Sequence, residues 1–145
     1  MSDVAYVALG SNLGDRRQYL AEARAALAQL PSSSVLAASS IEETEPLGGL
    51  QQPRYLNQMV KLETALAPRE LLARLHDIEQ QLGRTRRERW ESRTIDLDLV
   101  RYDDVSSDDP ELRLPHPGLA TRDFWQREMA EVDEALGARR KALGT

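Results

Sequence analysis

Cysteine is absent from the 145 residues of this chain, and histidine occurs only twice, as His76 and His116. The first absence excludes disulfide bridges, zinc ribbons and thiol nucleophiles together. The two histidines lie too far apart in the sequence to form a metal-binding pair on one helix. Any metal site is therefore expected to hold a hard cation through oxygen ligands.

Long hydrophobic runs are missing as well. The longest apolar stretch, Val4 to Leu9, is far shorter than the ~20 residues that a helix needs to cross a bilayer. The first residues, Met1 to Asp3, offer neither the basic start nor the apolar segment of a secretory signal. We therefore expect a cytoplasmic protein with no membrane partner.

The composition of the chain is that of an ordinary globular protein. Hydrophobic residues make up 41% and charged residues 30%, which argues against a disordered or collagen-like chain. At this length a compact fold buries roughly 68–70% of the surface that the unfolded chain exposes. We expect a single domain over residues 1–145, with a charged C-terminal tail from about residue 137.

Charge is distributed unevenly along the sequence. The net charge is −5, yet residues 84–94 hold five arginines against two glutamates, which leaves −8 for the rest of the chain. This cationic segment is consistent with a solvated charge run and with a binding site for a compact polyanion such as a triphosphate. The residues that follow the segment help to distinguish these two interpretations.

The spacing of apolar residues and turn signals predicts alternating strands and helices. Val4 to Leu9 is apolar on both alternating faces, as in a central strand that is covered on both sides. Asp15 followed by Gln18 resembles a capping box. The predicted elements are strand 4–9, helix 15–30, strand 35–43, strand 57–64, helix 68–82, strand 95–102, a hairpin over 105–114 and a last helix capped by Thr121. This β-α-β-β-α-β order predicts an α+β fold with a ferredoxin-like sheet, packed helices and an added C-terminal hairpin and helix.

Two carboxylates occupy the strand predicted over 95–102. The side-chain period of two turns Asp96 and Asp98 to one face of that strand and the apolar residues to the other. Like charges on one strand face repel each other, so the pair is unfavourable unless a cation neutralises it. Mg²⁺ is commonly held by one or two carboxylates plus substrate phosphates, and the arginines just upstream favour this interpretation. A solvent-facing polar stripe on an edge strand is the alternative.

Five ordered blocks of the sequence carry a family resemblance. They are residues 6–15 (YVALGSNLGD), 43–48 (ETEPLG), 52–57 (QPRYLN), 89–98 (RWESRTIDLD) and 114–117 (LPHP). Together they resemble the motifs of the 6-hydroxymethyl-7,8-dihydropterin pyrophosphokinase family, from Val4 to about Phe124. The resemblance implies an ATP-dependent diphosphotransferase of folate biosynthesis. Its small-molecule substrates would be ATP and the pterin, its cofactor two Mg²⁺, and its expected state a monomer.

The resemblance also implies roles for individual residues. It places Mg²⁺ on Asp96 and Asp98, in agreement with the strand argument. The implied catalytic phosphate-binding residues are Arg84, Arg86, Arg89 and Arg93. The implied pterin-binding residues are Thr44, Leu47, Gly48, Tyr55, Asn57, Trp90 and Phe124. The implied nucleotide-binding residues are His76, Glu79, Leu99, His116 and Arg122. Because Trp90 lies in a charged segment, we expect residues 83–92 to form a mobile lid over the substrates.

Two other functions remain open on the sequence alone. A ferredoxin-like sheet with basic and aromatic residues is also the plan of an RNA-recognition module. The chain lacks the corresponding glycine- and phenylalanine-rich run, and Asp96 and Asp98 would repel a phosphate backbone, so we expect no nucleic-acid partner. A non-catalytic relative is the second alternative, because Gly118 and residues 126–129 (QREM) depart from the family pattern.

Overall fold

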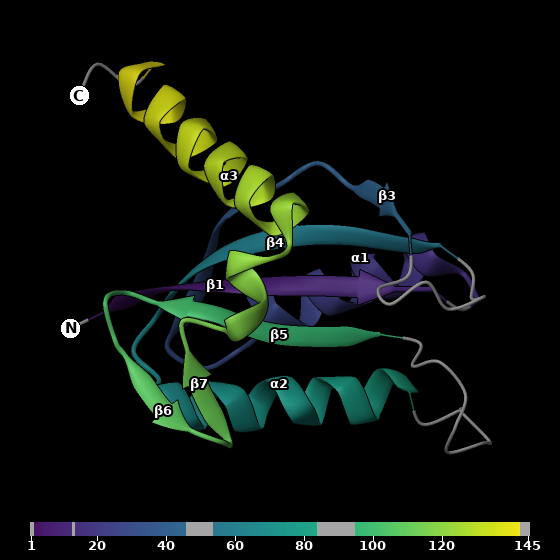
Figure 1. Ribbon diagram of the computed structural model, residues 1–145. Helices are drawn as coiled ribbons and strands as arrows, with labels where there is room; N and C mark the ends of the chain where they lie inside the picture. Colours follow the sequence, from purple (N-terminus) through teal and green to yellow (C-terminus); the bar gives the residue numbers. More distant parts are fainter. Residues whose placement is uncertain (1, 13, 46–53, 84–94, 143–145) are drawn as a thin grey trace.

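The computed structural model of the chain describes residues 2–12, 14–45, 54–83 and 95–142, and from residue 135 onward the backbone alone. Figure 1 shows a sheet with helices packed on it and a small hairpin beside one edge. Over the described residues the elements are β1 (Asp3–Ser11), α1 (Arg16–Ala28), β2 (Ser33–Ala38), β3 (Glu42–Thr44), β4 (Tyr55–Thr64), α2 (Pro68–Gly83), β5 (Asp96–Tyr102), β6 (Ser107–Asp109), β7 (Leu112–Leu114), a 3₁₀ helix η2 (Pro117–Ala120) and α3 (Asp123–Ala142).

The strands of the main sheet are antiparallel and follow the order β2-β4-β1-β5. The short strand β3 pairs with the start of β4, beyond the stretch that pairs with β2. Among the four long strands, the first and third in sequence are therefore central and the second and fourth are outermost. This is the order of a ferredoxin-like sheet, and it confirms the predicted fold class. No helix in the described part of the chain is long and apolar enough to cross a membrane.

Both faces of the sheet are covered, as the two-sided apolar pattern of β1 predicts. Ala5, Val7 and Leu9 point into a core formed with α1 and α2, whereas Tyr6 and Ala8 point into a second core formed with α3. The buried helical residues of the first core are Leu20, Ala23 and Leu27 of α1 and Leu71, Leu75 and Ile78 of α2, and those of the second are Trp125, Met129 and Val132 of α3. At one end of the α3 face, Gly10, Asn57, Asp96 and Asp98 line a pocket instead of the core.

The structure corrects the strand predicted over residues 35–43. It consists of two pieces, β2 and β3, because Ser39 disturbs the ladder between them. The Ser39 hydroxyl accepts the Met59 amide proton at 2.9 Å, and the Gln58 side chain donates to the Ser39 carbonyl at 2.6 Å. The Ser39 amide still donates to the Met59 carbonyl at 2.8 Å, but residues 39–41 face only residues 58 and 59 of β4, so the regular pairing stops until β3 begins at Glu42.

The helix ends are partly as predicted. The Asp15 carboxylate accepts the Gln18 amide proton at 3.1 Å, which confirms Asp15 as the cap of α1. Thr121 does not cap α3, because its hydroxyl donates to the Gly118 carbonyl at 3.3 Å and the helix begins at Asp123. The backbone of α3 stays helical through Ala142, and so includes most of the tail expected from about residue 137.

Candidate active site

Strand alternation gathers polar side chains on the α3 face at one end of the sheet. Gly10 of β1 pairs with Asn57 of β4 on one side and with Asp96 of β5 on the other. Ala8, two residues earlier on the same face, pairs with Asp98. Three strands therefore place an amide, two carboxylates and a glycine next to one another, although the residues come from distant parts of the sequence.

A first pocket of about 170 Å³ opens above this group of side chains. Its floor includes Gly10, Asn57 and both aspartates, and Tyr55 and Phe124 contribute aromatic walls. The pKa of the Tyr55 hydroxyl is raised, first by burial and then by the negative charge of Asp96, so this group stays a neutral phenol at physiological pH. The pocket thus combines flat apolar walls with a polar edge.

Asn57 is held in a fixed orientation at the polar edge of the first pocket. Its side chain is buried, and its Nδ2 donates a hydrogen bond to the Thr44 hydroxyl. A Cβ atom placed on Gly10 would lie 3.3 Å from Asn57 Oδ1, closer than about nine in ten real Cβ contacts. Gly10 therefore keeps open the space in front of the Asn57 amide.

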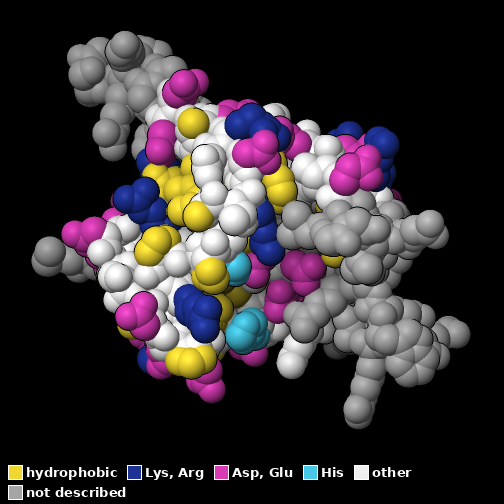
Figure 2. Space-filling view, viewed as in Figure 1, with side chains coloured by type: hydrophobic (Ala, Val, Ile, Leu, Met, Phe, Trp, Pro, Cys, Tyr) yellow, Lys and Arg dark blue, Asp and Glu magenta, His cyan; other side chains and the backbone are white. Residues whose placement is uncertain are grey.

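A second pocket of about 350 Å³ lies on the other side of the two aspartates, between α2, β5 and the hairpin. Asp96 and Asp98 line both pockets, so they form the boundary where the pockets meet. The residues implied for nucleotide binding that line this second pocket are His76, Glu79, Leu99 and His116. In Figure 2 histidine and acidic side chains adjoin each other on this side of the molecule.

The edge of β5 is tied to α2 by Glu79. Its Oε2 accepts the Leu97 amide proton at 2.8 Å, and Leu97 lies between the two aspartates in the sequence. This bond fixes the backbone that carries Asp96 and Asp98 relative to the helix. Glu79 therefore helps to fix the position of β5 and, with it, the positions of Asp96 and Asp98.

His116 connects the second pocket to the aspartates. Its Nδ1 accepts the Gly118 amide proton at 2.9 Å, so the neutral ring carries its proton on Nε2, which lies 3.9 Å from Asp98 Oδ1. Burial lowers the pKa of His116, and the Asp98 charge opposes that effect in part. The Trp125 ring packs edge-on against His116, with the centroids 5.0 Å apart.

Arg122 lines the first pocket, whereas the family resemblance implies a nucleotide contact for it. Its guanidinium lies 4.4 Å from the centroid of the buried Trp125 ring, a cation–π contact. Phe124 packs edge-on against the same ring at 6.3 Å between centroids. Trp125 thus supports Arg122, Phe124 and His116 together from the core of α3.

The oxygen ligands of this site fit Mg²⁺. Asp96 and Asp98 lie on one face of β5 and are half-buried. Among the described residues, no group of three or more histidine, aspartate or glutamate side chains forms a metal cage. Two carboxylates and few other protein ligands suit Mg²⁺, which keeps several waters and completes its shell with substrate phosphates.

Seven of the implied site residues lie outside the described residues. They are Leu47, Gly48, Arg84, Arg86, Arg89, Trp90 and Arg93, and most of the expected lid over residues 83–92 lies outside as well. The described ones that the structure brings together around Asp96 and Asp98 are Thr44, Tyr55, Asn57, His76, Glu79, Leu99, His116, Arg122 and Phe124.

Sequence reasoning did not identify Gly10, Ala8 or Trp125 as part of this site. Gly10 and Ala8 lie in the sequence block 6–15 without an implied role, and a tryptophan in an apolar helix stripe is typical of a core position. The available signal was Gly10 itself, because a glycine within or at the end of an apolar strand often marks a close approach by another group.

Comparisons with known proteins agree with this geometry. The family model described as 7,8-dihydro-6-hydroxymethylpterin-pyrophosphokinase (HPPK) matches residues 6–134. The 2-amino-4-hydroxy-6-hydroxymethyldihydropteridine pyrophosphokinase of Bacillus subtilis is 43% identical over 132 residues, which are 91% of this chain and 79% of that protein. Its counterpart in Pseudomonas aeruginosa is 39% identical over 127 residues, 88% of this chain and 78% of that protein.

A solved structure shows the same fold. A crystal structure of HPPK-DHPS in complex with substrates superimposes with a TM-score of 0.53 at 12% sequence identity. The match covers 74% of this chain and 29% of that longer protein. Because the family model covers most of the chain and the relatives exceed a third identity over most of their length, the chain belongs to the 7,8-dihydro-6-hydroxymethylpterin-pyrophosphokinase family.

Proposed function

We propose that this chain transfers the pyrophosphoryl group of ATP to the hydroxymethyl group of 6-hydroxymethyl-7,8-dihydropterin, a step of folate biosynthesis. The pterin hydroxyl oxygen attacks the β-phosphorus, and the bond from that phosphorus to the oxygen shared with the α-phosphate breaks. The products are the pterin diphosphate and AMP, and the hydroxyl proton is released. The observation that carries the proposal is the boundary formed by Asp96 and Asp98, which line both pockets.

The first pocket suits the pterin. A flat heterocycle fits between the aromatic side chains of Tyr55 and Phe124. The Asn57 amide offers one donor and one acceptor to the polar edge of such a ring, and its bond to Thr44 fixes which way the amide faces. Binding in this orientation directs the hydroxymethyl group toward the aspartates at the boundary. Leu47 and Gly48 remain proposed contacts.

The second pocket suits the nucleotide. Its larger volume matches the larger substrate, and it ends at the same two aspartates. Glu79, His116 and the exposed His76 offer hydrogen-bonding groups along its walls. With ATP in this pocket, its phosphates extend toward the bound pterin, and the two reacting groups meet at the boundary.

Asp96 and Asp98 would hold Mg²⁺, and we propose two ions because the family resemblance implies two. Bound Mg²⁺ would supply charge neutralisation of the phosphoryl oxygens during transfer. The chain's own contribution is orientation and electrostatic stabilisation. We assign the phosphate contacts to Arg84, Arg86, Arg89 and Arg93, since a guanidinium can make two parallel hydrogen bonds to phosphoryl oxygens.

Steady-state turnover tests the proposal. The purified chain is mixed with ATP, Mg²⁺ and the hydroxymethyldihydropterin, and AMP is quantified by chromatography. We expect AMP only when all three are present, and loss of most of it in Asp98→Asn. A wild-type protein that binds both substrates without forming AMP would instead support a non-catalytic relative, the alternative that the altered C-terminal sequence suggests.

A further inference from the structure

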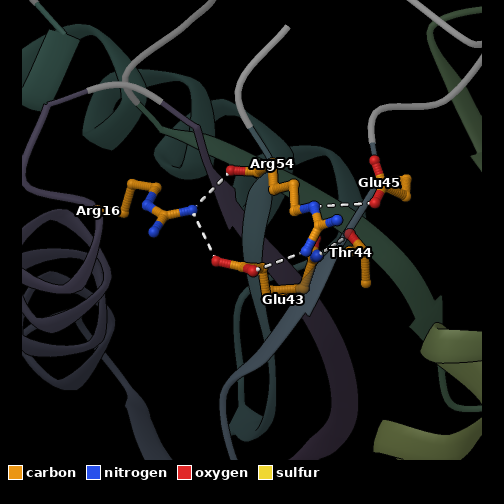
Figure 3. Close-up of polar contacts among 6 residues, drawn as sticks. Arg16, Glu43, Thr44, Glu45 and Arg54 are labelled. Atoms are coloured by element: carbon orange, nitrogen blue, oxygen red, sulfur yellow. Dashed lines mark hydrogen bonds and ion pairs between the residues drawn. The ribbon is translucent and has the colours of Figure 1, made fainter.

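A network of four charged side chains joins the two chain segments that flank the first pocket. The network consists of Arg16 of α1, Glu43 of β3, Glu45 just after β3, and Arg54 just before β4, and we call it the β3 clamp (Figure 3). Arg54 pairs with both glutamates, at 3.4 Å from Glu43 Oε1 and 2.8 Å from Glu45 Oε1. Opposite charges therefore hold the end of β3 against the start of β4.

Arg16 ties the same junction to the helix layer. Its Nη1 lies 3.3 Å from Glu43 Oε2 and donates to the Arg54 backbone carbonyl at 2.8 Å. One guanidinium thus connects α1 with both segments, and it is the least exposed member of the clamp, with 31% of its side chain accessible. The bond to a backbone carbonyl fixes the main chain immediately before Tyr55, an aromatic wall of the first pocket.

Thr44, which bonds Asn57, and Glu45 both line the first pocket, whereas Glu43 does not line it and pairs with Arg16 and Arg54. Strand alternation thus separates Glu43 from Thr44 within β3, and Arg54 also reaches Glu45 just past the end of the strand (Figure 3). Strand β3 pairs with β4 through only three residue pairs, from Glu42–Asn57 to Thr44–Tyr55. So short a ladder offers few backbone hydrogen bonds, and side-chain contacts on its outer face contribute a larger share of its order.

We propose that the β3 clamp is a positioning device that holds Thr44 against Asn57 and thereby sets the affinity of the first pocket for the pterin. The inference rests on the proposed function for the identity of the ligand. Arg16, Glu43 and Arg54 do not line the first pocket and act on it through Thr44, whereas Glu45 borders the pocket directly. The clamp therefore affects pterin binding and leaves the transfer step and ATP binding largely unchanged.

Charge reversal at Arg54 is the sharpest perturbation. Individual exposed ion pairs contribute little, but Arg54→Glu converts two attractions, to Glu43 and Glu45, into two repulsions. We expect the pterin KM and the pterin Kd from calorimetry to rise by about fivefold to tenfold. We expect kcat and the ATP KM to stay within about twofold of the wild-type values.

A charge swap provides a partial rescue. In Glu45→Arg combined with Arg54→Glu, the pair between positions 45 and 54 attracts again, while the repulsion between position 54 and Glu43 remains. The double variant is expected to bind the pterin more tightly than Arg54→Glu alone and to regain part of the lost affinity. The matched control is Arg69→Glu, since Arg69 has nearly the same side-chain exposure as Arg54, 61% against 60%, and pairs with Asp109 away from β3. Its pterin affinity should equal that of the wild type.

The outcomes separate the two proposals. Unchanged pterin affinity in Arg54→Glu, an equal loss in kcat, or failure of the swap to restore part of the affinity would each overturn the clamp while leaving the transfer reaction intact. A wild-type chain that binds the pterin and forms no AMP would overturn the transfer reaction. The ratio of the pterin Kd of Arg54→Glu to that of the wild type would still test the role of the clamp. If Arg54→Glu does not fold, Arg16→Gln removes two clamp contacts without adding a repulsion, and the same comparisons apply.

Discussion

Replacing Glu128 by glutamine should remove a large part of the pH dependence of this protein's stability. Glu128 lies on α3 with only 1% of its surface exposed, and among the described residues no donor forms a hydrogen bond to either of its carboxyl oxygens. Burial, and next the adjacent Glu42 carboxyl group, raise the pKa of Glu128 to about 9. Arg127 opposes this shift, whereas Glu131 adds to it. Glu128 is therefore a neutral acid at physiological pH.

The pKa of Glu128 fixes the sign of the effect. An unfolded glutamate ionises near the ordinary value of 4.5, so between 4.5 and about 9 the folded state binds one more proton than the unfolded state. This contribution to stability is fully present below pH 4.5 and is lost as the pH rises toward 9. The slope is about 1.4 kcal/mol per pH unit. Glutamine has the same shape and no titration, so the free-energy difference between variant and wild type should shift by about 3 kcal/mol from pH 6 to pH 8.

Chemical unfolding at several pH values measures this difference. Urea curves for wild type and Glu128→Gln give the free energy of unfolding at each pH, and the quantity of interest is the difference between the two proteins. The variant should become progressively more stable than the wild type as the pH rises. Glu134→Gln, an exposed position on the same helix, serves as the control and should show no such trend. Parallel pH profiles for wild type and Glu128→Gln would refute the reasoning.

Three further predictions concern the site. Asp98→Asn should lower kcat by about 10²-fold or more without lowering stability in the absence of Mg²⁺, as turnover and melting curves would show, and near-native turnover would contradict the metal assignment. Asn57→Ala should weaken pterin binding more than the chemical step, whereas Arg93→Ala should slow the chemical step more than it weakens pterin binding. Calorimetry measures the pterin affinity and kcat measures the chemical step. Unchanged pterin affinity in Asn57→Ala would place the pterin elsewhere. Gly10→Val should fill the space before the Asn57 amide and abolish pterin binding while ATP still binds, so retained pterin binding would show that Gly10 does not border the ligand.

The fold was largely predictable because its periodic patterns are local. Two-sided burial of β1 follows from its unbroken apolar run, and the shared face of Asp96 and Asp98 follows from strand alternation alone. The division between β2 and β3 was not predictable, because it depends on contacts from Ser39 to β4, a strand that comes later in the sequence.

Site residues that belong to recognisable sequence motifs could be predicted. Those that reach the site only through the register of strand pairing could not. The aspartates and Asn57 stand in recognisable sequence blocks. The position of Gly10 between Asn57 and Asp96 follows from the pairing of three strands, which no local pattern encodes. The β3 clamp likewise joins α1, β3 and β4, and its charges read in the sequence as ordinary surface residues.

The measurement that tests the central claim most directly follows the phosphorus atoms of ATP during the reaction. Phosphorus NMR of a mixture of the protein, ATP, Mg²⁺ and 6-hydroxymethyl-7,8-dihydropterin distinguishes transfer of a pyrophosphoryl group from transfer of a single phosphoryl group. The account predicts AMP and a pterin diphosphate in equal amounts, formed only when the pterin is present. Accumulation of ADP with a pterin monophosphate, or ATP consumption that is independent of the pterin, would contradict it.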